Sequence, residues 1–178
     1  IMPNHGKRAI VRARDTDYLN DFPRLDVSGY RALHLDGHQP DAALHYARAC
    51  RQTGILTSLD GGGVRENTDE LLRHIDVAVC AERMCEQLGL SPQGLLDLLR
   101  QRGCRIGAVT MGERGMLWYD ESGTVDTLPS LDVPAARIVD TSGAGDVFHG
   151  AYVWSYLNLP DQPWVEHFTF ARAASAHK

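Results

Sequence analysis

The chain has 178 residues, a length that is sufficient for one buried core and that fits a single domain, residues 1–178. Its formal net charge is -5, from 18 basic and 23 acidic residues with no basic run, which argues against nucleic acid or a membrane surface as a main partner. No apolar run approaches the ~20 residues of a membrane span, and the first residues do not read as a signal peptide, so we expect a cytoplasmic protein.

β-rich and amphipathic helical segments alternate through the centre of the chain. This pattern predicts parallel strands joined by helical crossovers, an α/β fold. Residues 31–35 and 55–59 are expected to form strands, and the helix between them starts at Pro40 and is closed by Gly54. The other expected elements are a short helix capped by Asn67 or Thr68, a strand over 75–79, a helix over 81–88, a helix from Ser91 and Pro92 to Gly103, a strand over 105–110, a hairpin of 116–119 and 123–128, a helix from 147 onward, and a last helix from Pro163 without a stop signal before Lys178.

The sequence contains four cysteines, which lie in or beside apolar segments and form no Cys-x-x-Cys pair: Cys50, Cys80, Cys85 and Cys104. Buried, reduced thiols are therefore expected, rather than disulfides or a zinc site. The eight histidines are scattered along the chain, so we expect hydrogen-bonded or solvent-exposed imidazoles instead of a metal centre.

The most informative segment is residues 140–146, which read Asp-Thr-Ser-Gly-Ala-Gly-Asp between an apolar run and an expected helix. Small residues at 143–145 let the backbone approach a ligand closely, and the amides at a helix start favour an anion. Asp146 follows in the first helical turn, where a bound phosphate would repel its carboxylate. As an ordinary N-terminal charge it would stabilise the helix by only about 0.3–1 kcal/mol, so its position favours a role in accepting a proton from an attacking hydroxyl.

The pattern Asp140-Thr141-x-Gly143-Ala144-Gly145-Asp146-x3-Gly150-Ala151 resembles the C-terminal signature of the ribokinase-like (PfkB) carbohydrate kinases. A second segment, Thr110-Met111-Gly112-Glu113-Arg114-Gly115, is similar to that family's Thr-x-Gly-x-x-Gly loop, which follows a core strand and borders the nucleotide. The resemblance implies a three-layer fold, in which helices flank a mainly parallel central sheet. It also implies a phosphotransferase that moves the γ-phosphoryl group of ATP, supplied with Mg²⁺, to a sugar hydroxyl.

Residue roles follow from the same resemblance. Asp146 occupies the position of the family's catalytic base. The backbone amides of Gly143, Ala144 and Gly145 occupy its anion hole for the transferred group. The positions that correspond to nucleotide binding are Thr110, Gly112, Gly115 and Thr141.

Two further segments bear on the substrate and the metal. Residues 60–65 lack both the dinucleotide and the P-loop pattern and look like the family's Asp-x-Asn-x-Arg segment. The resemblance implies that Asp60 and Arg65 line the substrate and phosphate side, with a plain turn as the alternative. The family's Asn-x-x-Glu pattern is replaced by Ala81 and Met84, so no protein metal site is expected and Mg²⁺ would arrive bound to ATP.

The small-molecule substrate is expected to be a ketose or related sugar, because residues 35–38, 59–63 and 146–151 look most like the fructokinase, ketohexokinase and sulfofructose kinase branch. Residues 1–11 read as the turn and second strand of a hairpin whose first strand is absent, so the family's N-terminal part and lid are expected to be missing. A homodimer through that lid stays an open expectation. The alternatives are a truncated or degenerate kinase-like domain that binds nucleotide without catalysis, and a structural or partner-binding α/β domain.

Overall fold

The structure, a computed structural model, describes residues 2–4, 7–9, 21–134, 136, 138 and 140–177. Its centre is a six-stranded sheet with the strand order β3-β4-β5-β6-β7-β8. Four strands run parallel and the last two complete the sheet as an antiparallel hairpin. The strands are β3 (Ala32–Leu35), β4 (Leu56–Gly61), β5 (Val77–Ala81), β6 (Ile106–Thr110), β7 (Met116–Tyr119) and β8 (Val125–Leu128).

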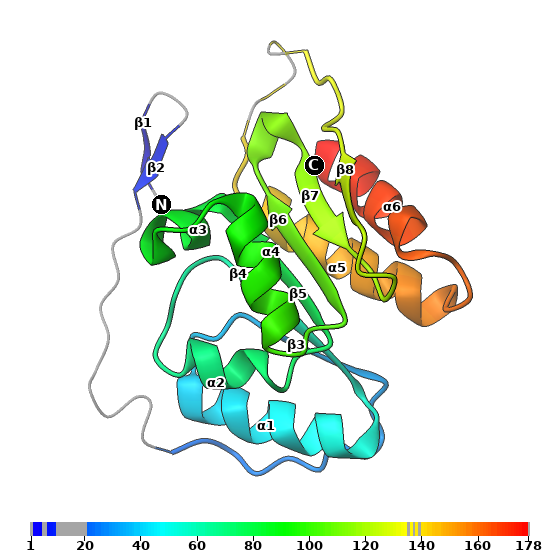
Figure 1. The fold of residues 1–178 in the computed structure, drawn as a ribbon. Coiled ribbons are helices and arrows are strands. Elements are labelled where there is room, and N and C mark those ends of the chain that lie inside the picture. The colour runs from blue at the N-terminus through cyan, green and yellow to red at the C-terminus, as the bar shows by residue number, and fades with distance from the viewer. Residues whose placement is uncertain are drawn as a thin grey trace.

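Helices cover both faces of this sheet, so the described chain forms three layers (Figure 1). One face packs against α1 (Pro40–Thr53), α2 (Thr68–Leu72), α3 (Glu82–Leu88) and α4 (Pro92–Gln101). The other face packs against α5 (Ala144–Asn158) and α6 (Trp164–Ala176). The expected α/β architecture with a mainly parallel sheet between helices is confirmed.

Side-chain alternation along the central strands explains the two cores. On β5, Ala78 and Cys80 belong to the core under α1 to α4, whereas Val77 and Val79 belong to the core under α5 and α6. Because successive side chains of a strand point to opposite faces, a strand that is buried on both sides reads as one continuous apolar run. All four cysteines are buried and free, as predicted.

Helix boundaries follow their local signals closely. Gly54 closes α1 in the left-handed conformation, and the Ser91 hydroxyl accepts a 3.0 Å hydrogen bond from the Gly94 amide at the start of α4. The structure lacks the side-chain cap that was predicted for α2. Asn67 occupies the N-cap position without a side-chain hydrogen bond, and the Thr68 hydroxyl instead accepts a bond of 2.7 Å from the Arg65 amide.

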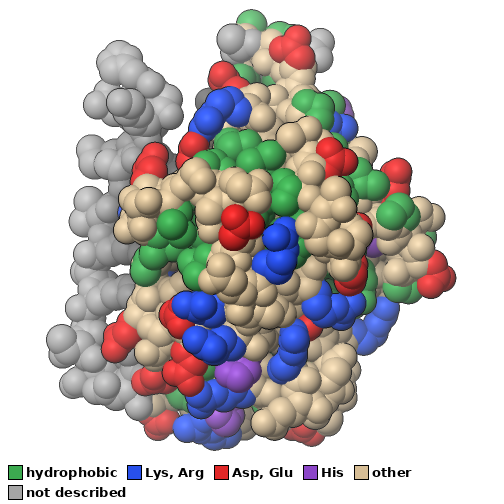
Figure 2. Space-filling model, viewed as in Figure 1, with side chains coloured by type: hydrophobic (Ala, Val, Ile, Leu, Met, Phe, Trp, Pro, Cys, Tyr) green, Lys and Arg blue, Asp and Glu red, His purple; other side chains and the backbone are tan. Residues whose placement is uncertain are grey.

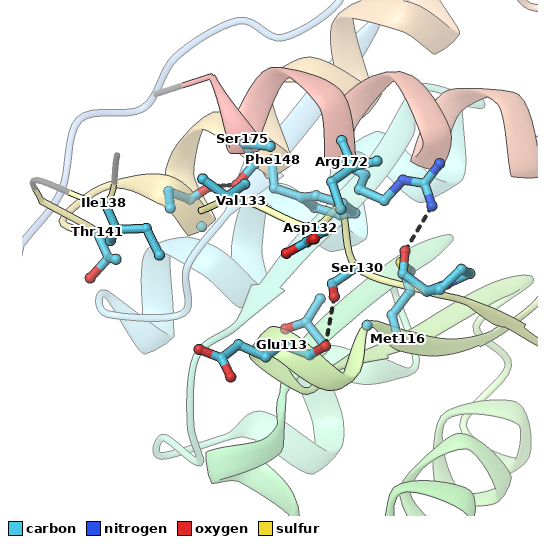
Figure 3. Close-up of a pocket in the computed structure, with 18 of the residues that line it drawn as sticks. Glu113, Met116, Ser130, Asp132, Val133, Ile138, Thr141, Phe148, Arg172 and Ser175 are labelled. Atoms are coloured by element: carbon cyan, nitrogen blue, oxygen red, sulfur yellow. Dashed lines mark hydrogen bonds between the residues drawn. The ribbon is translucent and has the colours of Figure 1, made fainter. Parts of the chain in front are cut away.

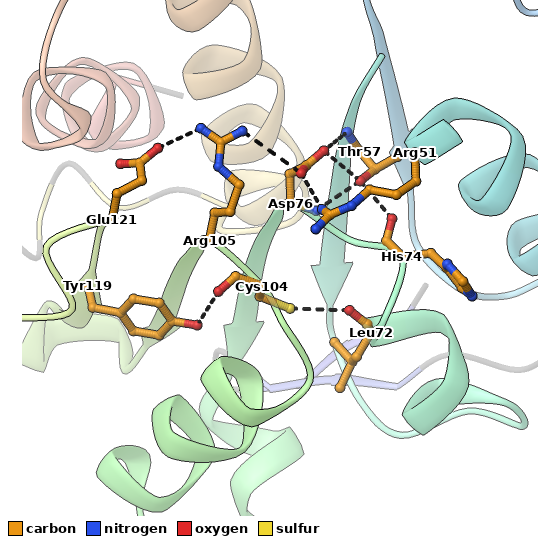
Figure 4. A network of polar contacts seen from close by, with 9 residues as sticks. All are labelled: Arg51, Thr57, Leu72, His74, Asp76, Cys104, Arg105, Tyr119 and Glu121. Carbon is orange, nitrogen blue, oxygen red and sulfur yellow. Dashed lines mark hydrogen bonds and ion pairs between the residues drawn. The ribbon is translucent and has the colours of Figure 1, made fainter. Parts of the chain in front are cut away.

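Two other predictions differ from the structure. The strand expected over 75–79 begins at Val77, because Asp76 bends the chain and bonds to Thr57 at the edge of the ladder (Figure 4). The first residues contain a short hairpin in which β1 (Met2–Asn4) pairs antiparallel with β2 (Lys7–Ala9), so the expected absence of a first strand is wrong. Residues 137 and 139 of the apolar run, and the final residue 178, lie outside the described residues.

Charged side chains of both signs gather over α1 and α2 in the view of Figure 2. They include the ion pairs Arg48–Glu70, Arg73–Asp69 and Arg102–Asp69. Opposite charges so close together on one surface produce little net field. In the part of the chain that is described, no helix has the length and apolar character needed to cross a membrane.

Candidate active site

The loop after β6 turns back sharply toward the hairpin. Residues 112–114 form a single 3-10 turn, which is closed by hydrogen bonds from the Met111 amide to the Gly115 carbonyl (2.8 Å) and from the Gly115 amide to the Gly112 carbonyl (3.0 Å). Gly115 has φ +79°, and a Cβ atom at this position would lie 2.3 Å from the Leu128 carbonyl oxygen. Only glycine fits this position, so the loop lies directly against the end of β8.

The second predicted segment is the turn that leads into α5. Gly143 adopts φ +80° and ends a turn in which the Ala144 amide donates to the Thr141 carbonyl at 3.2 Å. The next amides, of Gly145 and Asp146, lie in the first helical turn, where no carbonyl of the helix is available to them. A Cβ atom built at Gly145 would meet no atom within 4 Å, so the backbone is open there. This opening supplies amides to an anion, although Ala144 already has a partner.

The loop and the turn line one cavity of about 1130 Å³ (Figure 3). Six of the predicted residues line it together: Thr110, Gly112, Gly115, Thr141, Ala144 and Gly145. They come from segments about thirty residues apart, on either side of the β7–β8 hairpin. Four predicted residues do not line this cavity: Gly143, Asp146, Asp60 and Arg65.

Other walls of the cavity were missed by sequence reasoning. The segment after β8 and the helix α6 contribute them, and Figure 3 shows Ser130, Arg172 and Ser175 around the opening. The Ser130 hydroxyl donates to the Glu113 carbonyl at 2.6 Å, and an Arg172 guanidinium nitrogen donates to the Pro129 carbonyl at 2.7 Å. The buried Nε of Arg172 has no partner among the described residues. No motif marks these positions, because they reach the cavity through tertiary packing alone.

Asp146 lies on the exposed first turn of α5, beyond the cavity lining. The charge of Asp146 acts on His34 in β3 and on Asp60 near the end of β4. Burial raises the pKa of Asp60, and the negative charges of Asp146 and Asp36 raise it further. The charge of Asp146 is thus felt at the carboxyl end of β4, the end of the strands where parallel α/β sheets place ligands.

A line of polar side chains runs beneath this edge. The Nδ1 of His34 lies 2.9 Å from the Ser58 hydroxyl, which lies 2.7 Å from the Tyr152 hydroxyl. Tyr152 in turn contacts the Nδ1 of His149 at 3.2 Å, and the Nε2 of His149 lies 3.4 Å from an Asp60 oxygen. Ser58, Tyr152 and His149 are buried, and His149 also lines the cavity. Burial lowers the pKa of His149 to about 3, with a further contribution from His34, so its imidazole is neutral at physiological pH.

Arg65 points away from the cavity lining. Its guanidinium lies 3.0 Å from the Nε2 of His38 and 3.1 Å from the Val64 carbonyl oxygen, and His38 also contacts Asp36 at 2.8 Å. The predicted pair Asp60 and Arg65 thus reaches the same sheet edge, and Asp60 is within the field of Asp146.

Among the described residues, no group of three or more His, Cys, Asp or Glu side chains is arranged to hold a metal ion. Met84 is buried in the core under α4, and Glu82 forms an ion pair with Arg114. The Met84 side chain is therefore committed to core packing, and the Glu82 carboxylate to the Arg114 guanidinium.

Comparisons with known proteins agree with this geometry. Residues 5–178 match the model of the pfkB family carbohydrate kinases. The chain is 27% identical over 117 residues to the ribokinase of Lactococcus lactis, covering 66% of this chain and 36% of that protein. It is 22% identical over 175 residues to the ketohexokinase of Mus musculus, covering 85% of this chain and 55% of that protein.

The solved structure of a candidate ribokinase from Agrobacterium tumefaciens superimposes with a TM-score of 0.83 at 25% identity, covering 97% of this chain and 57% of that one. The fold is thus that of the ribokinase-like proteins. Because the family model matches nearly its whole length, the chain belongs to the pfkB family of carbohydrate kinases. It spans roughly one third to just over half of the proteins compared above.

Proposed function

We propose that this site transfers the γ-phosphoryl group of ATP to a hydroxyl of a small sugar. One observation carries the proposal: two segments far apart in sequence, the 110–115 loop and the 141–145 turn, line a single cavity, and Asp146 directly follows the lining residue Gly145. The cavity is large enough for a nucleotide, because small-molecule sites commonly measure about 300–1,000 Å³. ATP in complex with Mg²⁺ is the phosphoryl donor, and the bound Mg²⁺ neutralises charge on the phosphates.

The nucleotide belongs on the side of the 110–115 loop. Thr110, Gly112 and Gly115 shape this wall, and Thr141 closes it from the opposite segment. Arg172 adds a cation with an unsatisfied buried Nε, a donor that suits an electron-rich ligand. These features fit an anionic, aromatic ligand better than an apolar one.

The transferred group belongs at the start of α5. The first-turn amides, with Gly145 as the most open, stabilise negative charge on the phosphoryl group, together with the positive end of the helix dipole. The anion hole proposed for Gly143, Ala144 and Gly145 therefore centres on Gly145, since the Ala144 amide donates to Thr141.

Asp146 and Asp60 belong to the acceptor side. Asp146 orients the attacking hydroxyl and accepts its proton as the bond to phosphorus forms. Asp60 accepts a hydrogen bond from a neighbouring hydroxyl of the sugar, while Arg65, paired with His38, contributes positive charge at the rim. No covalent enzyme intermediate is required, because the hydroxyl attacks phosphorus directly.

A ketose or related sugar is the acceptor that we favour. The sequence segments that resemble the ketohexokinase branch support this choice, as does the similarity to mouse ketohexokinase over 175 residues. Ribokinase relatives keep ribose in the panel of candidates. Since ATP-Mg is abundant in the cytoplasm, we assign the reaction to that compartment.

The test measures ATP consumption by the full-length protein that contains this chain, against a panel of ketoses, aldoses, sulfofructose and nucleosides. We expect one class of sugar to support turnover, and the Asp146→Asn variant to lower kcat by about 10²- to 10⁴-fold with ATP binding unchanged. Turnover that survives Asp146→Asn would remove this residue from the mechanism. ATP binding without turnover on any acceptor would favour the nucleotide-binding alternative.

A further inference from the structure

The contacts beneath the sheet edge form a continuous line from His34 through Ser58, Tyr152 and His149 to Asp60, which we call the His34–Asp60 relay. It joins β3, β4 and α5, three elements that are far apart in sequence. The three middle members are at most 6% exposed. Hydroxyl and imidazole groups buried this deeply must be matched donor to acceptor, so their arrangement is constrained.

The position of each hydrogen in the relay follows from the Asp60 end. An ionised Asp60 can only accept, so the facing Nε2 of His149 carries the hydrogen. A neutral imidazole then has a bare Nδ1, which accepts from the Tyr152 hydroxyl. Tyr152, having used its only hydrogen, accepts from Ser58, and Ser58 accepts from the Nδ1–H of His34. One pattern of hydrogens thus satisfies all four contacts.

Asp60 needs such a donor because its other neighbours oppose its charge. The carboxylates of Asp146 on α5 and Asp36 after β3 both oppose its charge, and a hydrogen bond from the Gly62 amide and the charge of His38 partly offset them. Among the described residues, His149, Tyr152 and Cys80 are further titratable groups near this carboxylate, and the ring of His34 packs against that of His149. The 3.4 Å contact from His149 is longer than an ideal hydrogen bond, as catalytic contacts often are before substrate binds.

We propose that His149 is a positioning residue of the transfer site, whose Nε2–H, set by the His34–Asp60 relay, holds the Asp60 carboxylate as an acceptor beside Asp146. This inference rests on the proposed function for its kinetic consequence. The placement on α5 supports it, because Asp146 and His149 are three residues apart and so lie on one side of the helix. A single helix thereby carries both the base and the group that holds the base's neighbour.

Loss of the His149 donor has a defined consequence. Without it, Asp60 takes up a proton at higher pH, and a protonated Asp60 is a weaker, uncharged acceptor for the sugar hydroxyl. The acid limb of the kcat/KM profile for the sugar therefore moves upward in pH. A residue that only fills space would change the rate at every pH alike.

Two substitutions separate the roles of the two ring nitrogens. The amide nitrogen of glutamine reaches the position of Nε2, so His149→Gln keeps a donor toward Asp60. The carboxamide oxygen of asparagine replaces Nδ1, so His149→Asn keeps the Tyr152 contact and loses that donor. We expect the acid limb of His149→Asn to lie about one pH unit higher, which lowers kcat/KM up to about tenfold on that limb and leaves it unchanged on the plateau at higher pH. His149→Gln should keep the limb where the wild type has it.

A matched pair of tyrosines controls for lost stability. Tyr152→Phe removes the hydroxyl that sets the His149 tautomer, whereas Tyr119→Phe removes another buried hydroxyl, which donates to the Cys104 carbonyl at 3.0 Å at the opposite end of the sheet. Tyr152→Phe removes two buried hydrogen bonds, with Ser58 and with His149, and Tyr119→Phe removes one. Only Tyr152→Phe should move the acid limb. Equal shifts in both, or in neither, would overturn the inference.

The tautomer can be read without any activity. Long-range proton–nitrogen correlation spectra of the full-length protein should show His149 neutral with its hydrogen on Nε2 at pH 6. A hydrogen on Nδ1, or a doubly protonated ring, would refute the relay. If Asp146→Asn retains full turnover, the proposed function fails while this spectrum still tests the relay. If Asp146→Asn is inactive and His149→Asn keeps the wild-type limb, the relay fails and the proposed function stands.

Discussion

Two aspartates at opposite ends of the parallel strands show how differently one sheet treats the same side chain. Asp76 precedes β5 at the end where the strands begin, and it is 8% exposed. It accepts hydrogen bonds of 3.0 Å from both the amide and the hydroxyl of Thr57, and it forms ion pairs with Arg51 and Arg105 (Figure 4). Its charge is matched on every side.

Asp60 lies near the other end of β4 and has the opposite surroundings. Burial and two facing carboxylates, Asp146 and Asp36, raise its pKa, and its contact with His149 is to a neutral ring. Asp76 is held by its partners and therefore stabilises the fold. Asp60 is held against electrostatic repulsion, which is the condition expected of a group kept for a ligand. We therefore propose that the beginning of the sheet is built for stability and its carboxyl end for binding.

The largest expected effects come from neutralising each aspartate in turn. Asp76→Asn places an amide NH₂ among donors and removes the charge that Arg51 faces, so we expect it to lower the free energy of unfolding by about 3 kcal/mol. Asp60→Asn relieves repulsion, so stability should be unchanged or higher while kcat/KM for the sugar falls about 10- to 100-fold. Urea unfolding and steady-state kinetics of the full-length variants measure both quantities.

The crossed outcome would break the comparison. If Asp60→Asn destabilises the protein as much as Asp76→Asn, then Asp60 is a structural residue and the carboxyl end has no special character. Normal kinetics in folded Asp76→Asn serve as the control, because that side chain lies at the far end of the strands from the cavity.

The contrast between the two ends also explains what sequence could predict. The apolar runs and turn residues predicted the described strands and helices of the main sheet, because both cores are read from periodicity. Motif residues such as Thr110 and Gly145 were also placed in one cavity, since their function requires a local backbone shape. Both kinds of signal are local in sequence.

The missed features depend on distant partners. The line from His34 to Asp60 joins residues from β3, β4 and α5, and each of them except Asp60 alone reads as an ordinary core or surface residue. Arg172 reaches the cavity only because α6 packs beside α5. The shift of β5 to Val77 has the same origin, since the bend at Asp76 is set by Thr57 on a neighbouring strand. Contacts of this kind leave no spacing pattern.

Within the carboxyl end, a smaller effect separates the contribution of backbone conformation from that of close packing against β8. Gly115 and Gly112 both have positive φ, but only Gly115 lies against the Leu128 carbonyl, while Gly112 has open space around it. We expect Gly115→Ala to lower the free energy of unfolding by about 2 kcal/mol and to weaken ATP binding, because the loop must move off β8. Gly112→Ala should lower the free energy of unfolding by about 1 kcal/mol.

Calorimetric ATP titration and thermal unfolding of the two alanine variants provide the measurement. Equal losses in both would mean that backbone conformation alone matters and that the close approach to β8 contributes nothing.

The last expected effect is a difference in acid sensitivity between the two ends. His149 has a folded-state pKa of about 3, against an ordinary value of 6.5, so the unfolded chain binds a proton there that the folded protein does not. Stability from this residue is complete above pH 6.5 and falls by about 1.4 kcal/mol for each pH unit below it. The raised pKa of Asp60 acts in the opposite direction. As the pH falls toward the ordinary value of 3.8, the folded protein takes up this proton before the unfolded chain does, and this adds stability.

His149→Gln cannot titrate, so its unfolding free energy should fall less than that of the wild type between pH 7 and pH 5, as denaturant titration at each pH measures. His74 near Asp76 is the control, because its pKa is also lowered by burial and by Arg48, but its ring is only partly buried. His74→Gln should change the pH dependence of the unfolding free energy less than His149→Gln does. A larger change from His74 than from His149 would place the main acid-sensitive group at the stable end of the sheet, and the division between the two ends would no longer describe how this protein responds to pH.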